Sequence, residues 1–122
     1  MTEEQSQVVL RYRDGRTERA TLLDTDPERE LFTITRDDGV RDEVPFGELK
    51  ALFFPRANAD EPLEAASGST IAVEFADGEV IRGNAHYNPE RNGFFLFPLD
   101  RSKNDRIYVV NSAIASIEVE RL

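Results

Sequence analysis

The sequence predicts an all-β chain that folds as two tandem five-stranded barrels derived from an internal duplication. Three observations support this prediction: apolar residues alternate with a period of two, Asp-Gly pairs follow two of the alternating runs, and the whole pattern occurs twice. The apolar fraction of 39% and the charged fraction of 32% are typical of folded rather than disordered chains. Because modules of about 50 residues bury little core on their own, we expect the two modules to pack against each other.

The duplication becomes visible when Asp14-Gly15 is aligned with Asp77-Gly78, a shift of 63 residues. A Pro-Glu-Arg tripeptide then recurs at Pro27 and Pro89 with a slippage of one residue, and apolar positions coincide along both copies. The matched pairs are Val8 and Ile71, Leu10 and Val73, Tyr12 and Phe75, Leu31 and Phe94, Phe32 and Phe95, Val44 and Ile107, and Phe46 and Val109, and the run at 49–54 matches 114–119 with a two-residue insertion. Chance gives one such match but not the ordered set.

Each copy contains five short runs with strand character. They lie at 8–12, 16–24, 30–36, 40–46 and 50–54 in the first copy and at 71–75, 79–87, 93–99, 105–110 and 115–120 in the second. The Asp-Gly pair after the first run of each copy predicts a type I′ hairpin turn, in which both central residues have positive φ. Gly83, at the position of Ala20 in the first copy, predicts a sharp bend. Five short, bent strands in each copy predict a small barrel.

The duplication divides the chain into a first barrel at 1–56, a linker at 57–69 and a second barrel at 70–122. The linker is rich in proline, alanine, acidic and small polar residues, with a brief helical turn predicted around Leu63 to Ala66.

The spacing of these residues resembles that of Sm-like and other SH3-like barrels. The second copy carries the resemblance through Ile71, Val73, Phe75, Asp77, Gly78, Gly83, Ile107, Val109, Ile114 and Ile117. A closer similarity is to uncharacterised bacterial domains often attached to signalling and motility proteins, through the run LKALFF at 49–54 and through Pro89 to Arg91 with GFFLFP at 93–98. That similarity implies an adaptor-like role, which cannot be inferred from the fold alone.

Composition argues against several classes of function. The chain has no cysteine and a single histidine, His86, so we expect no metal site, no cofactor and no catalytic triad, and we predict that the protein is not an enzyme. The formal net charge of −9 disfavours binding to nucleic acid or to an anionic membrane. The acidic N-terminus has no targeting pattern and no apolar run approaches the length of a membrane span, so we expect a cytoplasmic protein without membrane insertion.

Two kinds of nucleotide-binding site are alternatives to a protein-binding role. An Sm-like RNA site would use Tyr87 and Asn88, with Arg91 nearby, for base stacking and phosphate contact. The first copy has Thr25-Asp26 at that place, and neither copy has the Arg-Gly pair of Sm-like proteins, so RNA binding is disfavoured. A PilZ-type cyclic-dinucleotide site matches the spacing of Asn88 and its neighbours but has Glu90 in place of the expected serine.

The most informative candidate site is the run GFFLFP, which is apolar on both faces. Phe94 and Leu96 point to one side of the strand, and Phe95 and Phe97 point to the other. One face therefore needs a second cover, which the other copy, the linker, a homodimer partner or another protein could supply. Our candidate partner-binding residues are Phe53, Phe54, Phe94, Phe95, Phe97 and Arg91, together with Arg11 and Arg13 of the basic first hairpin. The sequence thus predicts a non-catalytic protein-interaction module with a protein partner.

Overall fold

Alternating burial along the chain produces ten short strands, close to the predicted positions. The computed structural model describes residues 6–56, 68–88 and 90–120. The strands are β1 (Ser6–Tyr12), β2 (Thr17–Asp26), β3 (Leu31–Thr35), β4 (Arg41–Pro45), β5 (Leu49–Pro55), β6 (Ser69–Phe75), β7 (Val80–Ala85), β8 (Gly93–Pro98), β9 (Asn104–Val110) and β10 (Ile114–Val119). One-turn 3₁₀ helices precede the fifth strand of each half: η1 (Phe46–Glu48) and η2 (Asn111–Ala113). We call β1–β5 the first half and β6–β10 the second half.

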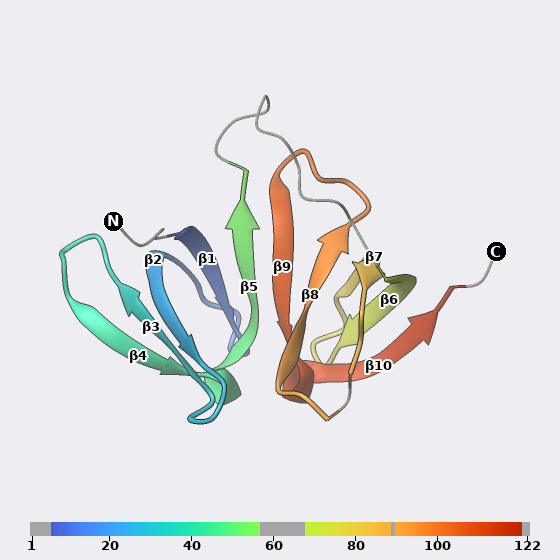
Figure 1. Cartoon of the computed structure of the whole chain (residues 1–122), viewed down its shortest axis with the longest axis horizontal. Helices are drawn as coiled ribbons and strands as arrows, with labels where there is room; N and C mark the ends of the chain where they lie inside the picture. Colours follow the sequence, from blue (N-terminus) through green and yellow to red (C-terminus); the bar gives the residue numbers. More distant parts are fainter. Residues whose placement is uncertain (1–5, 57–67, 89, 121–122) are drawn as a thin grey trace.

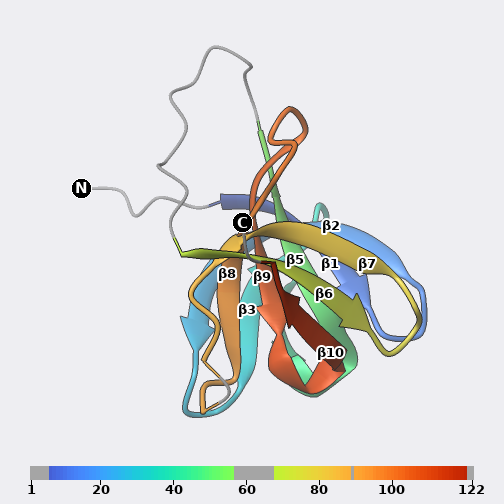
Figure 2. The ribbon, with the colours of Figure 1, turned by 90° about the vertical axis from the view of Figure 1, so that its right-hand side faces the viewer.

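All ten strands belong to one open antiparallel sheet, in the order β10-β6-β7-β8-β9-β5-β1-β2-β3-β4. The halves join edge to edge at the centre, where β5 pairs with β9 from Ala51 opposite Val109 to Pro55 opposite Asn104. Figure 1 shows the two curved halves on either side of this central pair, and Figure 2 turns the second half toward the viewer. The all-β class is confirmed, but the prediction of two separate five-stranded barrels is wrong.

The reason for this difference lies in which strand edges find each other. Alternation within a strand reports which side chains are buried, but it does not report which edge the strand will pair with. Here β5 uses its outer edge for the other half instead of closing its own, so the sheet continues from one half into the next. The predicted boundary between two domains stays a prediction, and the helical turn predicted around Leu63 to Ala66 lies outside the described residues.

The Asp-Gly turns differ from the predicted type I′ geometry. Gly15 has a φ of 96° and Gly78 a φ of 94°, but neither preceding aspartate has a positive φ. In each hairpin the glycine N–H donates to the residue three positions earlier, as in Gly15 to Tyr12 at 3.1 Å. This is a type I turn followed by a glycine bulge, which is the usual three-residue hairpin loop. The Asp14 side chain accepts a hydrogen bond from the Arg16 N–H at 2.9 Å and fixes the turn.

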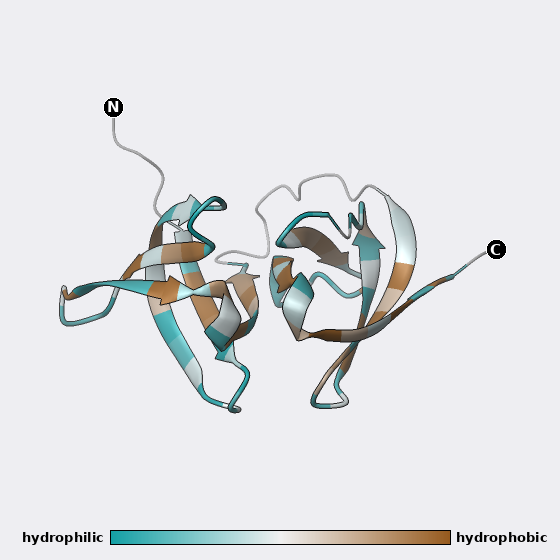
Figure 3. Ribbon diagram, turned by 90° about the horizontal axis from the view of Figure 1, so that it is seen from below, coloured by the Kyte–Doolittle hydropathy of each residue, from teal (hydrophilic) through white to brown (hydrophobic). Residues whose placement is uncertain are grey.

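The β5 strand packs on both of its faces, as its composition requires. Six consecutive residues, Leu49 to Phe54, are buried. The ammonium of Lys50, at a bulge in the pairing with β1, lies 4.8 Å from the ring centroid of Phe75, and on the other face the Phe54 ring lies 5.9 Å from that of Phe95. One buried hydrophobic cluster therefore runs through both halves. Figure 3 shows hydrophobic segments along the strands and mostly hydrophilic connecting loops.

An ionic cluster joins the halves beside this core. The side chain of Lys50 is 7% exposed and donates to the carboxylates of Asp77, at 2.8 Å, and Glu79. Glu79 also forms an ion pair with Arg11 at 3.3 Å. The hydrogen bond from Lys50 lowers the pKa of Asp77. Arg13 donates to the Leu49 carbonyl at 2.9 Å. Lys50, Arg11 and Arg13 of the first half are thus paired with the second half or with the backbone.

Gly83 permits a close approach between β7 and β8. A Cβ at this position would lie 2.3 Å from the Phe97 carbonyl oxygen, which is too short for any side chain.

The pairing of β8 with β9 revises the alignment of the two copies: Val44 faces Phe32, whereas its counterpart Ile107 faces Leu96. Phe32 therefore corresponds to Leu96 and not to Phe95, a slip of one residue that turns Phe95 outward. Across the described ranges, no helix is long and apolar enough to span a membrane.

Candidate functional site

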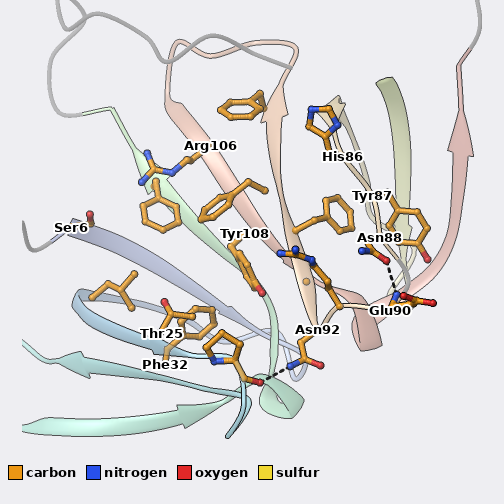
Figure 4. Close-up of a pocket in the computed structure, with 18 residues that line it drawn as sticks. Ser6, Thr25, Phe32, His86, Tyr87, Asn88, Glu90, Asn92, Arg106 and Tyr108 are labelled. Carbon is orange, nitrogen blue, oxygen red and sulfur yellow. Dashed lines mark hydrogen bonds between the residues drawn. The ribbon is translucent and has the colours of Figure 1, made fainter. Parts of the chain in front are cut away.

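A cavity of about 1100 Å³ lies between the two halves and takes its walls from both of them. We call it the aromatic groove. Phe32 and Thr25 of the first half lie on one side, Tyr87 and Asn88 of the second half lie on the other, and Tyr108 lies between them (Figure 4). Its other main lining residues are Phe54, His86, Arg91, Phe94, Phe95, Phe97 and Arg106. A groove of this size and composition is typical of a binding site.

The groove contains a continuous series of aromatic contacts. The Phe95 ring is 5.9 Å from Phe54 and 5.2 Å from Tyr108, and Tyr108 in turn is 5.5 Å from Phe32. These separations are those of favourable tilted and edge-to-face pairs. Phe54 and Phe32 are buried, whereas the Phe95 side of the series is open: Phe95 is 43% exposed. The series thus presents an apolar surface that is left partly exposed among the residues that the structure describes.

Two arginines give the groove a local positive charge. The Arg106 guanidinium lies 4.3 Å from the Phe54 ring centroid and 5.4 Å from that of Phe95, and it forms an ion pair with Asp105 at 2.8 Å. Arg91 is exposed and forms no ion pair with any residue that the structure describes. Burial raises the pKa of Tyr108, and the positive charge of Arg91 acts in the opposite direction. Arg91 is therefore the groove cation with the greater capacity for a new anionic partner.

The loop that carries Arg91 is held in place by three asparagines. The Asn88 side-chain oxygen accepts from the Glu90 N–H at 2.9 Å, and Asn111 donates to the Asn88 and Arg91 carbonyls at 3.0 and 2.6 Å. Asn92 donates to the Pro27 carbonyl of the first half at 2.8 Å, a bond drawn in Figure 4. The loop thus bridges the halves, and one of the two polar ends of the Asn88 side chain is already occupied.

The structure brings most of the predicted site residues together. Phe54, Phe94, Phe95, Phe97 and Arg91 line the groove, and so do Tyr87 and Asn88 of the nucleotide alternative. The remaining three predicted residues lie elsewhere. Phe53 is buried beneath the Arg11 guanidinium at 4.6 Å, and Arg13 bonds to Leu49 and Ser112. Arg11 and Arg13 therefore help to join the halves and do not form a free basic stripe.

Sequence reasoning missed Phe32, Arg106 and Tyr108 among the lining residues of the groove. Tyr108 and Arg106 lie on alternate positions of β9, and the same period of two that exposed the outer face of β8 could have found them. Phe32 had no such signal, because its approach to Tyr108 depends on the pairing of β5 with β9.

The residues of the groove are suited to binding, with few groups suited to proton transfer or metal coordination. His86, an exposed residue, lines it beside aromatic rings, amides and arginines, with Glu90 as the lining carboxylate. Within the described ranges, no group of three or more His, Cys, Asp or Glu residues is placed to hold a metal ion.

No curated protein and no solved structure matches the chain. A family model does match, over residues 4–121, and its description is a family of unknown function (DUF6982). The match spans both halves, including β5, β9 and the loops that form the groove. The chain therefore belongs to the DUF6982 family.

Proposed function

We propose that this protein is a non-catalytic protein-interaction module whose aromatic groove binds an extended protein segment. The observation that carries the proposal is Phe95, an aromatic side chain that is 43% exposed between two aromatic neighbours and an arginine. A large apolar side chain exposed in a groove contributes more binding free energy than one on a flat surface, because a partner seated in the groove removes water from more of its surface. Phe, Tyr and Arg are also the residue types enriched in interfaces.

The chemistry of the groove indicates what the segment contains. The exposed edge of Phe95 fits a bulky aliphatic or aromatic side chain. Arg91, which has no ion-pair partner among the described residues, fits a carboxylate close to that side chain. Arg106 is already paired with Asp105 and so contributes stacking area more than charge. The partner is therefore a segment with an apolar anchor and a neighbouring acidic residue.

The test begins with selection of peptides from a random displayed library against the wild-type protein. The affinity of a selected peptide is then measured by fluorescence anisotropy for wild type, Phe95→Ser and Leu99→Ser. Leu99 is 60% exposed and is not among the lining residues of the groove, so it is the matched control. We expect Phe95→Ser to weaken binding at least about tenfold, or about 1.4 kcal/mol, and Leu99→Ser to leave it unchanged. Equal affinity for wild type and Phe95→Ser would contradict the proposal.

One observation favours nucleotide binding as a second candidate. Tyr87, 43% exposed, lines the same groove as Arg91, and together they offer a stacking surface and a cation. Single-stranded RNA oligonucleotides are therefore titrated in parallel. RNA binding at moderate salt that is lost in the Tyr87→Ser variant but kept in the Leu99→Ser variant would favour nucleotide binding over peptide binding.

A further inference from the structure

The ten-stranded sheet ends in two open edges, and only one of them is suited to accept another strand. Within the described ranges, β4 pairs only with β3, and β10 pairs only with β6. Exposed edge strands present unpaired N–H and C=O groups, and proteins commonly blunt them with proline or charge. The two edges of this sheet differ in that respect.

The β4 edge is blunted by Pro45. The Phe46 N–H donates to the Glu30 carbonyl at 2.8 Å, on the β3 side. Because backbone groups alternate in direction along a strand, those of Pro45 and Glu43 face the open side. Pro45 has no N–H to offer there, so the short β4 strand lacks one of its outward donors.

The β10 edge has no proline, and Glu118 is the one charged residue in the strand. The Glu120 N–H donates to the Thr70 carbonyl at 2.9 Å, on the β6 side, so the backbone groups of Ile117 and Val119 face outward. Both residues have an N–H. Val119 is 54% exposed, and Ile117 is half-buried against the core. The strand contains neither proline nor lysine.

The first half shows how this strand position is used when it has a partner. There β5 holds the place that β10 holds in the second half, and it pairs on both edges, with β1 and with β9. If the β5–β9 junction were repeated between two chains, β10 of one chain would pair with β4 of the next. Pro45 would then take the position that Tyr108 holds opposite Leu52. The missing donor of Pro45 weakens such a head-to-tail assembly. A second β10 has its donors intact.

We propose that two copies of this chain associate by antiparallel pairing of their β10 strands about a two-fold axis. A register centred on Ile117 joins outward-facing residues: Ile117 meets its own counterpart, and Glu118 meets Ser116. No two carboxylates then stand directly opposite each other. The interface is isologous and closes as a dimer, with the aromatic grooves left open on both copies.

The net charge of −9 on each copy opposes this association, and that opposition gives the dimer a characteristic response to salt. Raising the ionic strength from about 0.1 M to about 1 M shortens the Debye length from about 10 Å to about 3 Å. The dissociation constant of the dimer therefore falls as salt rises. A complex held by attraction between opposite charges would respond in the reverse direction.

Sedimentation velocity on wild type, Val119→Pro and Val119→Thr tests the pairing. Val119→Pro removes one outward N–H without removing a bond to β6, whereas Val119→Thr keeps the N–H at similar size. We expect wild type and Val119→Thr to dimerise more tightly as salt rises, and Val119→Pro to lose at least about tenfold in association. A wild type that stays monomeric across the salt range, or an equal dimer of Val119→Pro, would overturn the proposal. We expect Phe95→Ser to dimerise as wild type does, so that a failure of the dimer is distinguished from a failure of binding in the groove.

Spin labels identify the strand involved, since the chain has no native cysteine. Glu118→Cys on β10 and Glu43→Cys on β4 each place a label on an exposed position. We expect dipolar broadening in the electron paramagnetic resonance spectrum of the Glu118→Cys dimer and none in that of the Glu43→Cys dimer. Broadening that needs a mixture of the two labelled proteins would indicate head-to-tail pairing and would overturn the two-fold dimer.

Discussion

Leu52 lies at the centre of the sheet, and its truncation tests whether the two halves fold as one unit. The residue is fully buried on β5, where it faces Leu10 of the first half and Tyr108 of the second. Leu52→Ala loses buried apolar surface and leaves a cavity, a combination that costs about 3 kcal/mol at a fully buried site. With a urea dependence of about 1.5 kcal/mol per molar, the unfolding midpoint falls by about 2 M.

The assay is urea unfolding followed residue by residue in the amide NMR spectrum. Ile34 reports the first half and Val73 reports the second, and both are buried. We expect both signals to move to the same lower midpoint, while Val40→Ala, at a site 52% exposed, changes stability by less than about 0.5 kcal/mol. A second half that keeps its wild-type midpoint while the first half loses stability would refute the account of a shared core.

Two further predictions concern single positions. Gly83→Ala should cost about 1–3 kcal/mol in thermal unfolding, because its Cβ meets the neighbouring backbone at 2.3 Å, whereas Gly47→Ala, with open space around it, should be nearly neutral; equal effects would contradict the close approach. Burial and the hydrogen bond to Glu18 raise the pKa of Tyr12 to about 12, above its ordinary value of about 10. The stabilisation from protonated Tyr12 is therefore complete below pH 10 and is lost as the pH rises toward 12. In tyrosinate absorbance a Tyr12→Phe variant should lack the titration near pH 12, and an unchanged titration curve would contradict this.

The strands could be predicted from the sequence because their signal is local. Alternation at Val8, Leu10 and Tyr12 depends only on which side chains meet the core, and the observed β1 contains all three. The turn type was less accessible, since Asp-Gly suits both a two-residue type I′ turn and the type I turn with a glycine bulge that forms here. The choice between them depends on the pairing register beyond the turn.

The continuation of the sheet from one half into the other, and part of the site, depend on contacts distant in sequence. Whether the second edge of β5, the one not paired with β1, meets β4 of its own half or β9 is decided by competition between edges, which no single run of residues encodes. The apolar faces of the run at 93–98 indicate that a cover is needed, but not which element supplies it. The same pairing brings Phe32 to the groove and places Arg11 in an ion pair with Glu79. These residues were accordingly missed or assigned to a free surface.

The central claim is that a partner segment binds in the aromatic groove, and chemical-shift mapping tests it most directly. A peptide selected against the wild-type protein is titrated into the labelled protein, and the amide and aromatic signals are followed. We expect the largest shifts at Tyr87, Arg91, Phe95 and Tyr108, which line the groove beside the β5–β9 junction, and no change in β10. Shifts confined to the β10 edge, or spread over surfaces away from the groove, would contradict it.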